Sequence, residues 1–189
     1  MTELGSAPVP PPGDDDHRRP PLGDARDHDG TPPGDARDHD GGPPVIIVYA
    51  DFECPYCAAV HARLTPLPAE LVFRHFPVRS SHPRAWPAAT AAEAAGLQGR
   101  FWEMHDALFA DQARLEDPHL WRRARDLGLD VDRFDADRRS DAAVTRVKRD
   151  FHSGVRAGVV TTPALFLWGP DGAERIEVAA LEQALTGGR

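Results

Sequence analysis

The chain has 189 residues, of which 41% are hydrophobic and 28% are charged, a composition typical of globular proteins. Its net charge of −8 argues against nucleic acid or an anionic membrane as the main partner. The longest apolar run, VIIVYA at residues 45–50, is far shorter than the roughly 20 residues that a membrane-spanning helix needs. The N-terminus has neither the basic start nor the apolar core of a secretory signal, so we expect a cytoplasmic location.

Residues 1–43 differ in composition from the rest of the chain. Proline, glycine and aspartate dominate this stretch, and large aliphatic residues are rare in it. Such a segment buries too little apolar surface to offset the entropy that is lost on ordering, so we predict a disordered tail. The octapeptide GDARDHDG occurs in it twice, at residues 23–30 and 34–41, which indicates a local duplication in a linker.

Residues 44–189 carry the patterns of a folded domain. The apolar, β-branched run PVIIVYADF predicts a buried strand, and the following CPYCAAVHARL has a proline where a first helical turn tolerates one. Further along, the patterns predict a strand at 71–76, two helices within 85–109, a helix at 117–129, a short and a longer helix up to Gly154 or Gly158, strands at 164–168 and 174–178, and a terminal helix.

The order of these elements predicts the fold class. Strand, helix and strand come first, a block of helices follows, and two strands and a helix end the chain. When the block at about residues 82–158 is set aside, a small mixed sheet with flanking helices remains. We therefore predict an α/β domain with a central helical insertion.

Cys54 and Cys57 are the only cysteines of the chain and stand three positions apart. A C-x-x-C pair is compatible with a redox disulfide or with half of a zinc site. A structural zinc site needs about four ligands, usually from a second C-x-x-C or a closely spaced histidine pair. The chain has no third cysteine and no histidine pair with that spacing, so zinc is the weaker hypothesis. His61, one helical turn beyond Cys57, is expected to be a surface residue.

The position of Cys54 favours the redox interpretation. It stands where a strand ends and a helix begins, so its sulfur is expected to face the unpaired N–H groups and the positive dipole end of that helix. This environment stabilises the thiolate, which is the form that attacks disulfides. Cys57 follows one helical turn later, close enough to bond back to Cys54 and release a mixed-disulfide partner.

The neighbours of the cysteines predict a moderate acidity for Cys54. Pro55 and Tyr56, which separate the two cysteines, carry no positive charge. Asp51 and Glu53 precede the motif and would oppose a thiolate if their charges were near it. We expect a Cys54 pKa below that of a free thiol but well above the lowest known values of about 3.5.

A second candidate element is far downstream, in GVVTTPALFLWG at residues 158–169. Pro163 stands just before an apolar strand, where it marks a bend at the start of that strand. Together with DFECPYC, FRHFPV, GLQGRFWEMHDALF and DLGLDVDRF, this segment resembles the DsbA-like thiol–disulfide oxidoreductases of the thioredoxin superfamily, in the bacterial branch that carries DFECPYC. Similar domains also occur fused to bacterial sodium/proton antiporters.

The resemblance covers about residues 45–187 and implies a thioredoxin-like fold with a DsbA-like insertion. It implies that Cys54 attacks, that Cys57 resolves, and that a cis peptide before Pro163 lies beside the disulfide. The site residues that it implies are Cys54, Cys57, Pro55, Tyr56, Thr162 and Pro163. The implied partners are thiol or disulfide substrate proteins, with glutathione or another small thiol as an alternative, and the disulfide itself takes the place of a cofactor.

Two features depart from the family pattern. Thr161 stands where many relatives have glycine, and Tyr56 stands where the DsbA prototype has histidine, which leaves the redox potential and the substrate open. Two other functions remain as alternatives: a non-catalytic thioredoxin-like binding module, and a DsbA-related isomerase or glutathione-dependent transferase that acts on a small molecule. The presence of both cysteines argues against each alternative.

Other conspicuous residues are expected to be structural. Trp102, Met104, His105 and Phe109 recur at helical spacing, which is more typical of the core of a helical insertion than of a cofactor site. His75 stands within a predicted strand, where a structural role is also the better interpretation.

Overall fold

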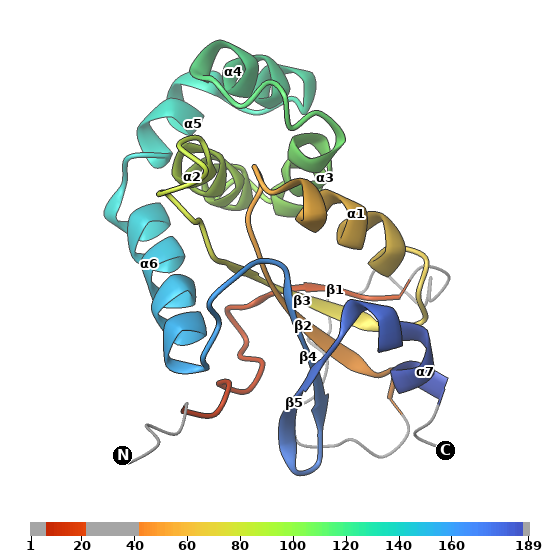
Figure 1. The fold of residues 1–189 in the computed structure, drawn as a ribbon. Helices are drawn as coiled ribbons and strands as arrows, with labels where there is room; N and C mark the ends of the chain where they lie inside the picture. Colours follow the sequence, from red (N-terminus) through yellow and green to blue (C-terminus); the bar gives the residue numbers. More distant parts are fainter. Residues whose placement is uncertain (1–6, 22–41, 187–189) are drawn as a thin grey trace.

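The computed structural model describes residues 7–21 and 42–186, except for a few side chains near the C-terminus (Figure 1). Within these residues, five strands form one sheet in the order β1-β3-β2-β4-β5. The strands are β1 (His17–Arg19), β2 (Val45–Ala50), β3 (Glu70–His75), β4 (Ala164–Gly169) and β5 (Gly172–Ile176). β2 and β3 are parallel, and the other neighbouring pairs are antiparallel.

Seven α-helices accompany the sheet in the described ranges. They are α1 (Pro55–Leu64), α2 (Ala85–Gly96), α3 (Phe101–Ala110), α4 (Asp117–Asp126), α5 (Val131–Asp137), α6 (Asp141–Arg156) and α7 (Leu181–Thr186), the last preceded by a 3₁₀ turn at Val178–Ala180. Figure 1 shows α2 to α5 gathered beyond one end of the sheet and α6 running back beside it. The mixed sheet with this helical block between β3 and β4 confirms the predicted fold class. None of the described helices is both long and apolar enough to cross a membrane.

β2 is the centre of the sheet and is buried along its whole length. Successive side chains of a strand point to opposite faces. Ile46 and Val48 accordingly join the core that α1, α2 and α3 cover, whereas Ile47 and Tyr49 join the core on the other face, against which Phe151 of α6 packs. The uninterrupted apolar run VIIVYA suits a strand that is covered on both faces. Because this buried strand ends at Ala50, the turn that carries the chain to Cys54 begins there.

The N-terminal segment at residues 7–21 packs onto the domain. β1 pairs antiparallel with the outer edge of β3, where His17 lies opposite Phe73, and Val9 is buried in the core. The prediction of disorder for residues 1–43 is therefore wrong for this segment. Residues 22–41, which hold both copies of GDARDHDG, lie outside the described residues.

Charged and hydrogen-bonding groups explain why this segment packs despite its few aliphatic side chains. The buried guanidinium of Arg74 on β3 donates hydrogen bonds to the carbonyl oxygens of Pro10 and Pro11 at 2.9 Å each. It also donates to the carboxylate of Asp16 at 2.8 Å, and both side chains of this ion pair are at most 5% exposed. A buried charge needs such partners, and within the sheet the guanidinium donates only to the hydroxyl of Tyr49, at 3.1 Å, so the N-terminal segment supplies its counter-ion.

Gly154 on α6 marks the closest approach of that helix to the sheet. A Cβ at this position would lie 2.7 Å from Cδ2 of Phe76 and 3.0 Å from Cδ1 of Tyr49, both of which are buried aromatic rings. We expect Gly154→Ala to lower the free energy of unfolding by about 1–3 kcal/mol, because rings in a packed core have little room to move. Urea denaturation followed by circular dichroism measures this loss. Gly42→Ala, whose Cβ meets no atom within 4 Å and whose φ is not positive, is the control. An alanine at position 154 without loss of stability would contradict the prediction.

Candidate active site

Cys54 and Cys57 stand at the start of α1, directly after the turn that follows β2. Cys54 is the N-cap residue, with extended backbone angles (φ −77°, ψ 119°), and Pro55 occupies the first turn. Proline suits this position because the first N–H groups of a helix have no partner within the helix. Both cysteines are free thiols and both are buried. Tyr56 between them points outward and is 73% exposed.

The loop before β4 closes the site from a distant part of the chain. The peptide bond between Thr162 and Pro163 is cis, and the carbonyl oxygen of Thr162 lies 3.6 Å from Sγ of Cys54. On the other side, the backbone N–H of Asp51 donates to Sγ of Cys57 at 3.5 Å. The structure thus brings together the residues that the resemblance implies, from the end of β2, the start of α1 and the loop that leads into β4.

The two thiols have contrasting acidities. The side chain of Cys57 donates to the sulfur of Cys54 and, together with backbone N–H groups at the start of α1, lowers the pKa of Cys54 to about 5. Burial raises the pKa of Cys57 far above its ordinary value. Near neutral pH the pair is therefore a reactive thiolate at Cys54 and a protonated thiol at Cys57. The value for Cys54 lies within the range expected from the sequence.

Asp51 and Glu53 have structural partners close to the motif. The carboxylate of Asp51 accepts hydrogen bonds from the backbone N–H of Val78 at 2.8 Å and from Nδ1 of His82 at 2.9 Å. The carboxylate of Glu53 accepts from the backbone N–H of Arg84 at 2.5 Å. These contacts tie the turn before Cys54 to the loop before α2. The acidity of Cys54 depends first on Cys57, not on these two carboxylates.

This arrangement predicts the pH dependence of alkylation. We expect iodoacetamide to modify Cys54 with a midpoint at a pH of about 5, because only the thiolate reacts. Cys57→Ala should move that midpoint upward by more than about one pH unit, since it removes the thiol that donates to the Cys54 sulfur. Mass spectrometry of the alkylated protein over a pH series measures both midpoints. An unchanged midpoint in Cys57→Ala would assign the acidity of Cys54 to the helix alone.

One residue near the site was not identified from the sequence. Gln112, just after α3, donates from Nε2 to the backbone carbonyl oxygens of Phe52 at 2.8 Å and Cys54 at 2.9 Å. It holds the start of α1 against the insertion. A single glutamine in a polar turn carries no local signal for this role, so only the tertiary structure could reveal it.

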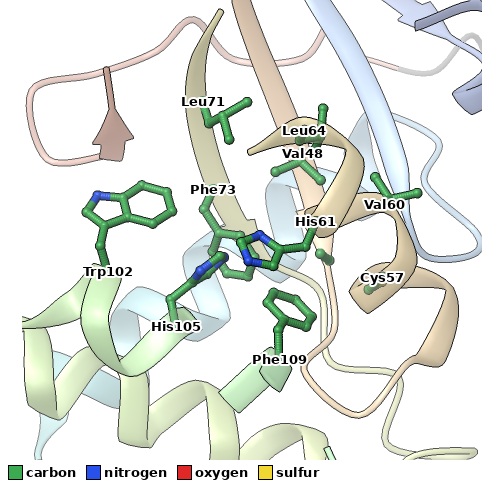
Figure 2. A pocket seen from close by; sticks show the side chains of 11 residues that line it. Val48, Cys57, Val60, His61, Leu64, Leu71, Phe73, Trp102, His105 and Phe109 are labelled. Atoms are coloured by element: carbon green, nitrogen blue, oxygen red, sulfur yellow. The ribbon is translucent and has the colours of Figure 1, made fainter. Parts of the chain in front are cut away.

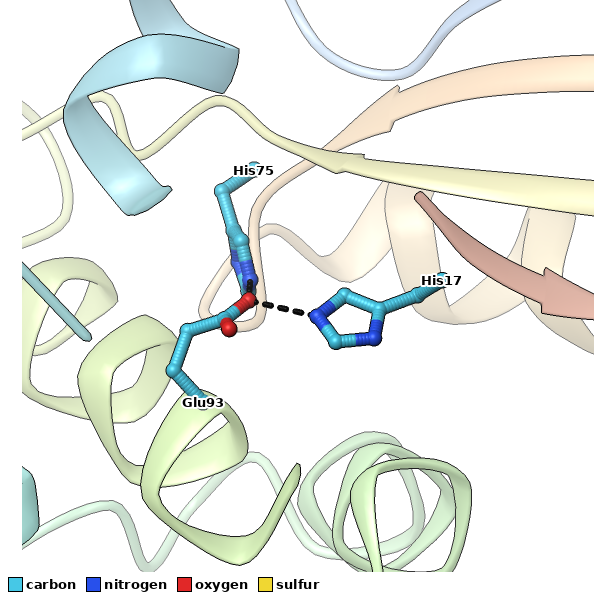
Figure 3. Close-up of side chains that lie close together, drawn as sticks. All are labelled: His17, His75 and Glu93. Atoms are coloured by element: carbon cyan, nitrogen blue, oxygen red, sulfur yellow. Dashed lines mark hydrogen bonds and ion pairs between the residues drawn. The ribbon is translucent and has the colours of Figure 1, made fainter. Parts of the chain in front are cut away.

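Two histidine clusters in the described part of the chain have the composition of metal ligands. In the first, Nε2 of His17 and Nε2 of His75 lie 2.7 Å and 2.6 Å from the same oxygen of Glu93 (Figure 3). Metal-bound histidines generally donate their second ring N–H to an acceptor. Nδ1 of His75 is buried and has no hydrogen-bond partner among the described residues. We therefore interpret His17, His75 and Glu93 as a hydrogen-bonded clasp that holds β1 on the domain.

The second cluster joins α1 to α3. His61 and His105 both approach Oδ1 of Asp106, at 3.4 Å and 3.0 Å, and the ring of His61 stacks on Phe109. His61 is half-buried, so its expected surface position is wrong: α3 packs over this end of α1. The expected core positions of Met104, His105 and Phe109 are confirmed, since all three are buried.

Comparisons with known proteins agree with this geometry. A family model described as "Thioredoxin" matches residues 39–186. A sodium/proton antiporter NhaA 1 of Mycolicibacterium gilvum is 40% identical over 152 residues, which are 76% of this chain and 25% of the antiporter. The chain thus spans about a quarter of the length of the curated relatives that it matches.

Solved structures of DsbA-like and thioredoxin-like proteins share the fold of this chain. A thioredoxin-like oxidoreductase from Silicibacter pomeroyi superposes with a TM-score of 0.64 at 24% identity and covers 77% of this chain and 86% of its own. The thiol-disulfide exchange protein alpha-DsbA2 from Wolbachia pipientis has a TM-score of 0.63 at 16% identity, covering 78% of this chain and 83% of its own. The chain therefore belongs to the thioredoxin family and has the DsbA-like form of its fold.

Proposed function

We propose that the chain is a thiol–disulfide oxidoreductase in which Cys54 is the attacking cysteine and Cys57 the resolving one. The observation that carries the proposal is the placement of two free thiols three positions apart at the start of α1, with the carbonyl oxygen of Thr162 3.6 Å from the Cys54 sulfur. The pKa of Cys54, lowered to about 5, and the raised pKa of Cys57 suit this placement. Stabilising a thiolate beside a protonated thiol has no structural benefit of its own. It does suit a dithiol that attacks with the first sulfur and closes with the second.

The proposed reaction needs only the dithiol. The Cys54 thiolate attacks one sulfur of a substrate disulfide, forms a mixed disulfide, and displaces the other substrate sulfur as a thiolate. Cys57 then attacks Cys54, and the internal disulfide forms as the second substrate thiol departs. The two electrons that reduce the substrate come from the two cysteines, so no further cofactor takes part.

The surroundings of Cys54 favour an extended peptide or a small thiol as substrate. Cys54 itself is nearly covered. The two segments that form the site each carry one exposed apolar side chain: Tyr56 between the cysteines is 73% exposed, and Val160, two residues before Thr162, is 83% exposed. The carbonyl oxygen of Thr162 lies 3.6 Å from Sγ of Cys54, which supports a role for this backbone in meeting a substrate chain. We propose protein thiols or disulfides as substrates, glutathione as an alternative, and a cytoplasmic location, with the dithiol acting as a moderate oxidant or as a reductant.

Insulin reduction tests the proposal against a non-catalytic binding module. With dithiothreitol as electron donor, we expect the protein to accelerate the precipitation of insulin B chains, and the Cys54→Ser, Cys57→Ser double variant to have no effect. Equilibration with glutathione should give a reduction potential between about −270 mV and about −120 mV, because the acidity of Cys54 lies between those of the corresponding cysteines in thioredoxin and DsbA. A protein that neither accelerates the reaction nor forms the internal disulfide would be a binding module.

A further inference from the structure

The resolving step of the proposed function, on which this inference rests, places negative charge on the sulfur of Cys57. Cys57 is only 2% exposed, and burial raises the pKa of its thiol far above the ordinary value. The backbone N–H of Asp51 donates to this sulfur at 3.5 Å and acts in the opposite direction, by lowering that pKa. A donor stabilises a developing charge best when it is already held in place before the reaction. The contacts that hold the Asp51 N–H therefore affect the rate of this step.

Cys57 also borders a small pocket between α1, the sheet and α3, which is lined mainly by apolar side chains (Figure 2). His61 and His105 are the histidines of this lining, and Figure 2 shows their rings beside each other. Each has a ring nitrogen directed to Oδ1 of Asp106, at 3.4 Å and 3.0 Å. Among the described residues, no hydrogen bond reaches the Cys57 sulfur from the histidines of this pocket. The sulfur depends instead on the N–H of Asp51 at the end of β2.

The polar groups of Asp51 together fix the turn before the cysteines. Its carbonyl oxygen accepts from the backbone N–H of Cys54 at 3.2 Å, and its Oδ1 accepts from the backbone N–H of Glu53 at 2.8 Å. Its Oδ2 accepts from the backbone N–H of Val78 at 2.8 Å and from Nδ1 of His82 at 2.9 Å. The side chain of Asp51 therefore ties its own backbone, and with it the N–H that faces Cys57, to the loop between β3 and α2.

His82 provides the side-chain donor among these contacts. It lies in the loop between β3 and α2, 31 positions after Asp51, and its side chain is 22% exposed whereas that of Asp51 is fully covered. Burial alone would lower the pKa of His82, but the hydrogen bond and the charge of Asp51 outweigh burial and raise that pKa. Because a carboxylate only accepts hydrogen bonds, the Nδ1 atom of His82 carries the hydrogen. The two side chains therefore stabilise each other.

We propose that His82 is a positioning residue for the resolving step, which acts through Asp51. Its Nδ1–H holds the Asp51 carboxylate, and the carboxylate keeps the N–H of the same residue directed at the Cys57 sulfur. Cys54 depends less on this contact, because Gln112 also holds its carbonyl oxygen at 2.9 Å and because its acidity depends first on Cys57. His82 should therefore affect the closing of the internal disulfide more than the first attack.

The step conserves atoms and charge. Cys57 loses its proton to solvent, and the resulting thiolate, which accepts from the Asp51 N–H, attacks Cys54 in the mixed disulfide. The Cys54–Cys57 bond forms while the bond from Cys54 to the substrate breaks, and the substrate thiolate takes a proton from solvent. Over the whole cycle the substrate disulfide gains two electrons and two protons, and the dithiol loses them.

Stopped-flow reaction of the full chain with dithionitrobenzoate separates the two chemical steps. This aryl disulfide releases one coloured thiolate when Cys54 attacks it and a second when Cys57 closes the internal disulfide. Loss of a positioned donor costs about 100- to 1,000-fold in other enzymes, and a donor that is only less firmly held should cost less. In His82→Leu we therefore expect the second phase to slow by about tenfold and the first to change by less than about twofold.

Two further histidine variants accompany this measurement. His82→Asn places an amide N–H close to the position of Nδ1 without the imidazole, so the second phase should return to within about threefold of the native rate. His152→Leu, on the exposed face of α6, is the control and should leave both phases unchanged. Circular dichroism and the melting temperature show that each variant is folded.

A double-mutant cycle tests whether His82 acts through Asp51. Asp51→Asn keeps the size of the side chain but replaces one of its two accepting oxygens by a donor, which disrupts the same contacts. We expect it to slow the second phase by about tenfold as well. Residues that act as a unit are not additive, so the variant with both changes should be slower than either single variant by no more than about twofold.

Each result supports or overturns the role of His82. A second phase in His82→Leu with the native rate would overturn it. Equal slowing of both phases, with a lower melting temperature and no recovery in His82→Asn, would assign His82 a purely structural role and overturn it as well. Multiplication of the two single effects in the double variant would show that His82 does not act through Asp51. Release of a single thiolate by the native protein would refute the proposed function itself.

Discussion

The Cys54→Ser substitution is expected to abolish thiol–disulfide exchange, whereas Cys57→Ser should stop the reaction at a mixed disulfide with the substrate. Serine at position 54 is not ionised at neutral pH, so the loss of activity should reach at least about 1,000-fold, as for other covalent nucleophiles. In Cys57→Ser the attacking thiolate remains but nothing displaces the bound substrate. Insulin reduction measures the first effect, and non-reducing electrophoresis with mass spectrometry of the adduct measures the second.

The two variants are controls for each other, because each removes one sulfur at the same helix start. Both should melt close to the native temperature, since serine has nearly the size of cysteine. The adduct in Cys57→Ser should map to Cys54 and disappear on addition of dithiothreitol. Adducts that accumulate in Cys54→Ser instead, through Cys57, would reverse the assigned order of attack.

Asp16→Ala is expected to lower the free energy of unfolding by about 3 kcal/mol or more. Its carboxylate lies 2.8 Å from the guanidinium of Arg74 and 3.2 Å from that of Arg146, and it is only 5% exposed. Removing it leaves the buried charge of Arg74 without its counter-ion, a change that costs about 3–5 kcal/mol in other buried pairs. Urea denaturation of the full chain, followed by circular dichroism, measures the loss.

The exposed Asp14, two positions earlier in the same segment, provides the matched control. Asp14→Ala should change the free energy of unfolding by no more than about 0.5 kcal/mol, as is usual for surface substitutions. Equal stability of the two variants would mean that the N-terminal segment does not pack onto the domain in solution. Glu93→Ala should also destabilise the protein, because it breaks the clasp that joins His17 and His75.

The parts of the fold that were predicted correctly are those with strong local patterns. VIIVYA is apolar over its whole length, as a central strand requires, and a proline marks the first turn of α1. Glycines that follow helices, such as Gly128 with its positive φ of 72°, separate the elements of the insertion. The active-site pair could be assigned because two cysteines at that spacing after a strand support few chemistries.

The N-terminal segment was missed because its stability depends on contacts that are distant in the sequence. HRR at β1 has none of the apolar alternation that predicts a strand. Its partners lie on β3, α2, α3 and α6. For example, Asp16 and its partner Arg146 are separated by 130 positions in the sequence. A prediction of disorder from composition considers only how much apolar surface a segment can bury. It does not include ion pairs between the segment and charged side chains that are buried in the rest of the fold.

The contact between Cys54 and Thr162 joins positions that are 108 residues apart in the chain. A ribosome therefore releases the C-x-x-C motif and the whole of α1 long before it has made the loop that completes the site. Until that loop is in place, the Cys54 sulfur lacks its contact with Thr162, which adds to the lowering of its pKa by Cys57. The full acidity of Cys54 is therefore reached only when the loop that leads into β4 is in place, so its thiol reactivity reports on a late stage of folding.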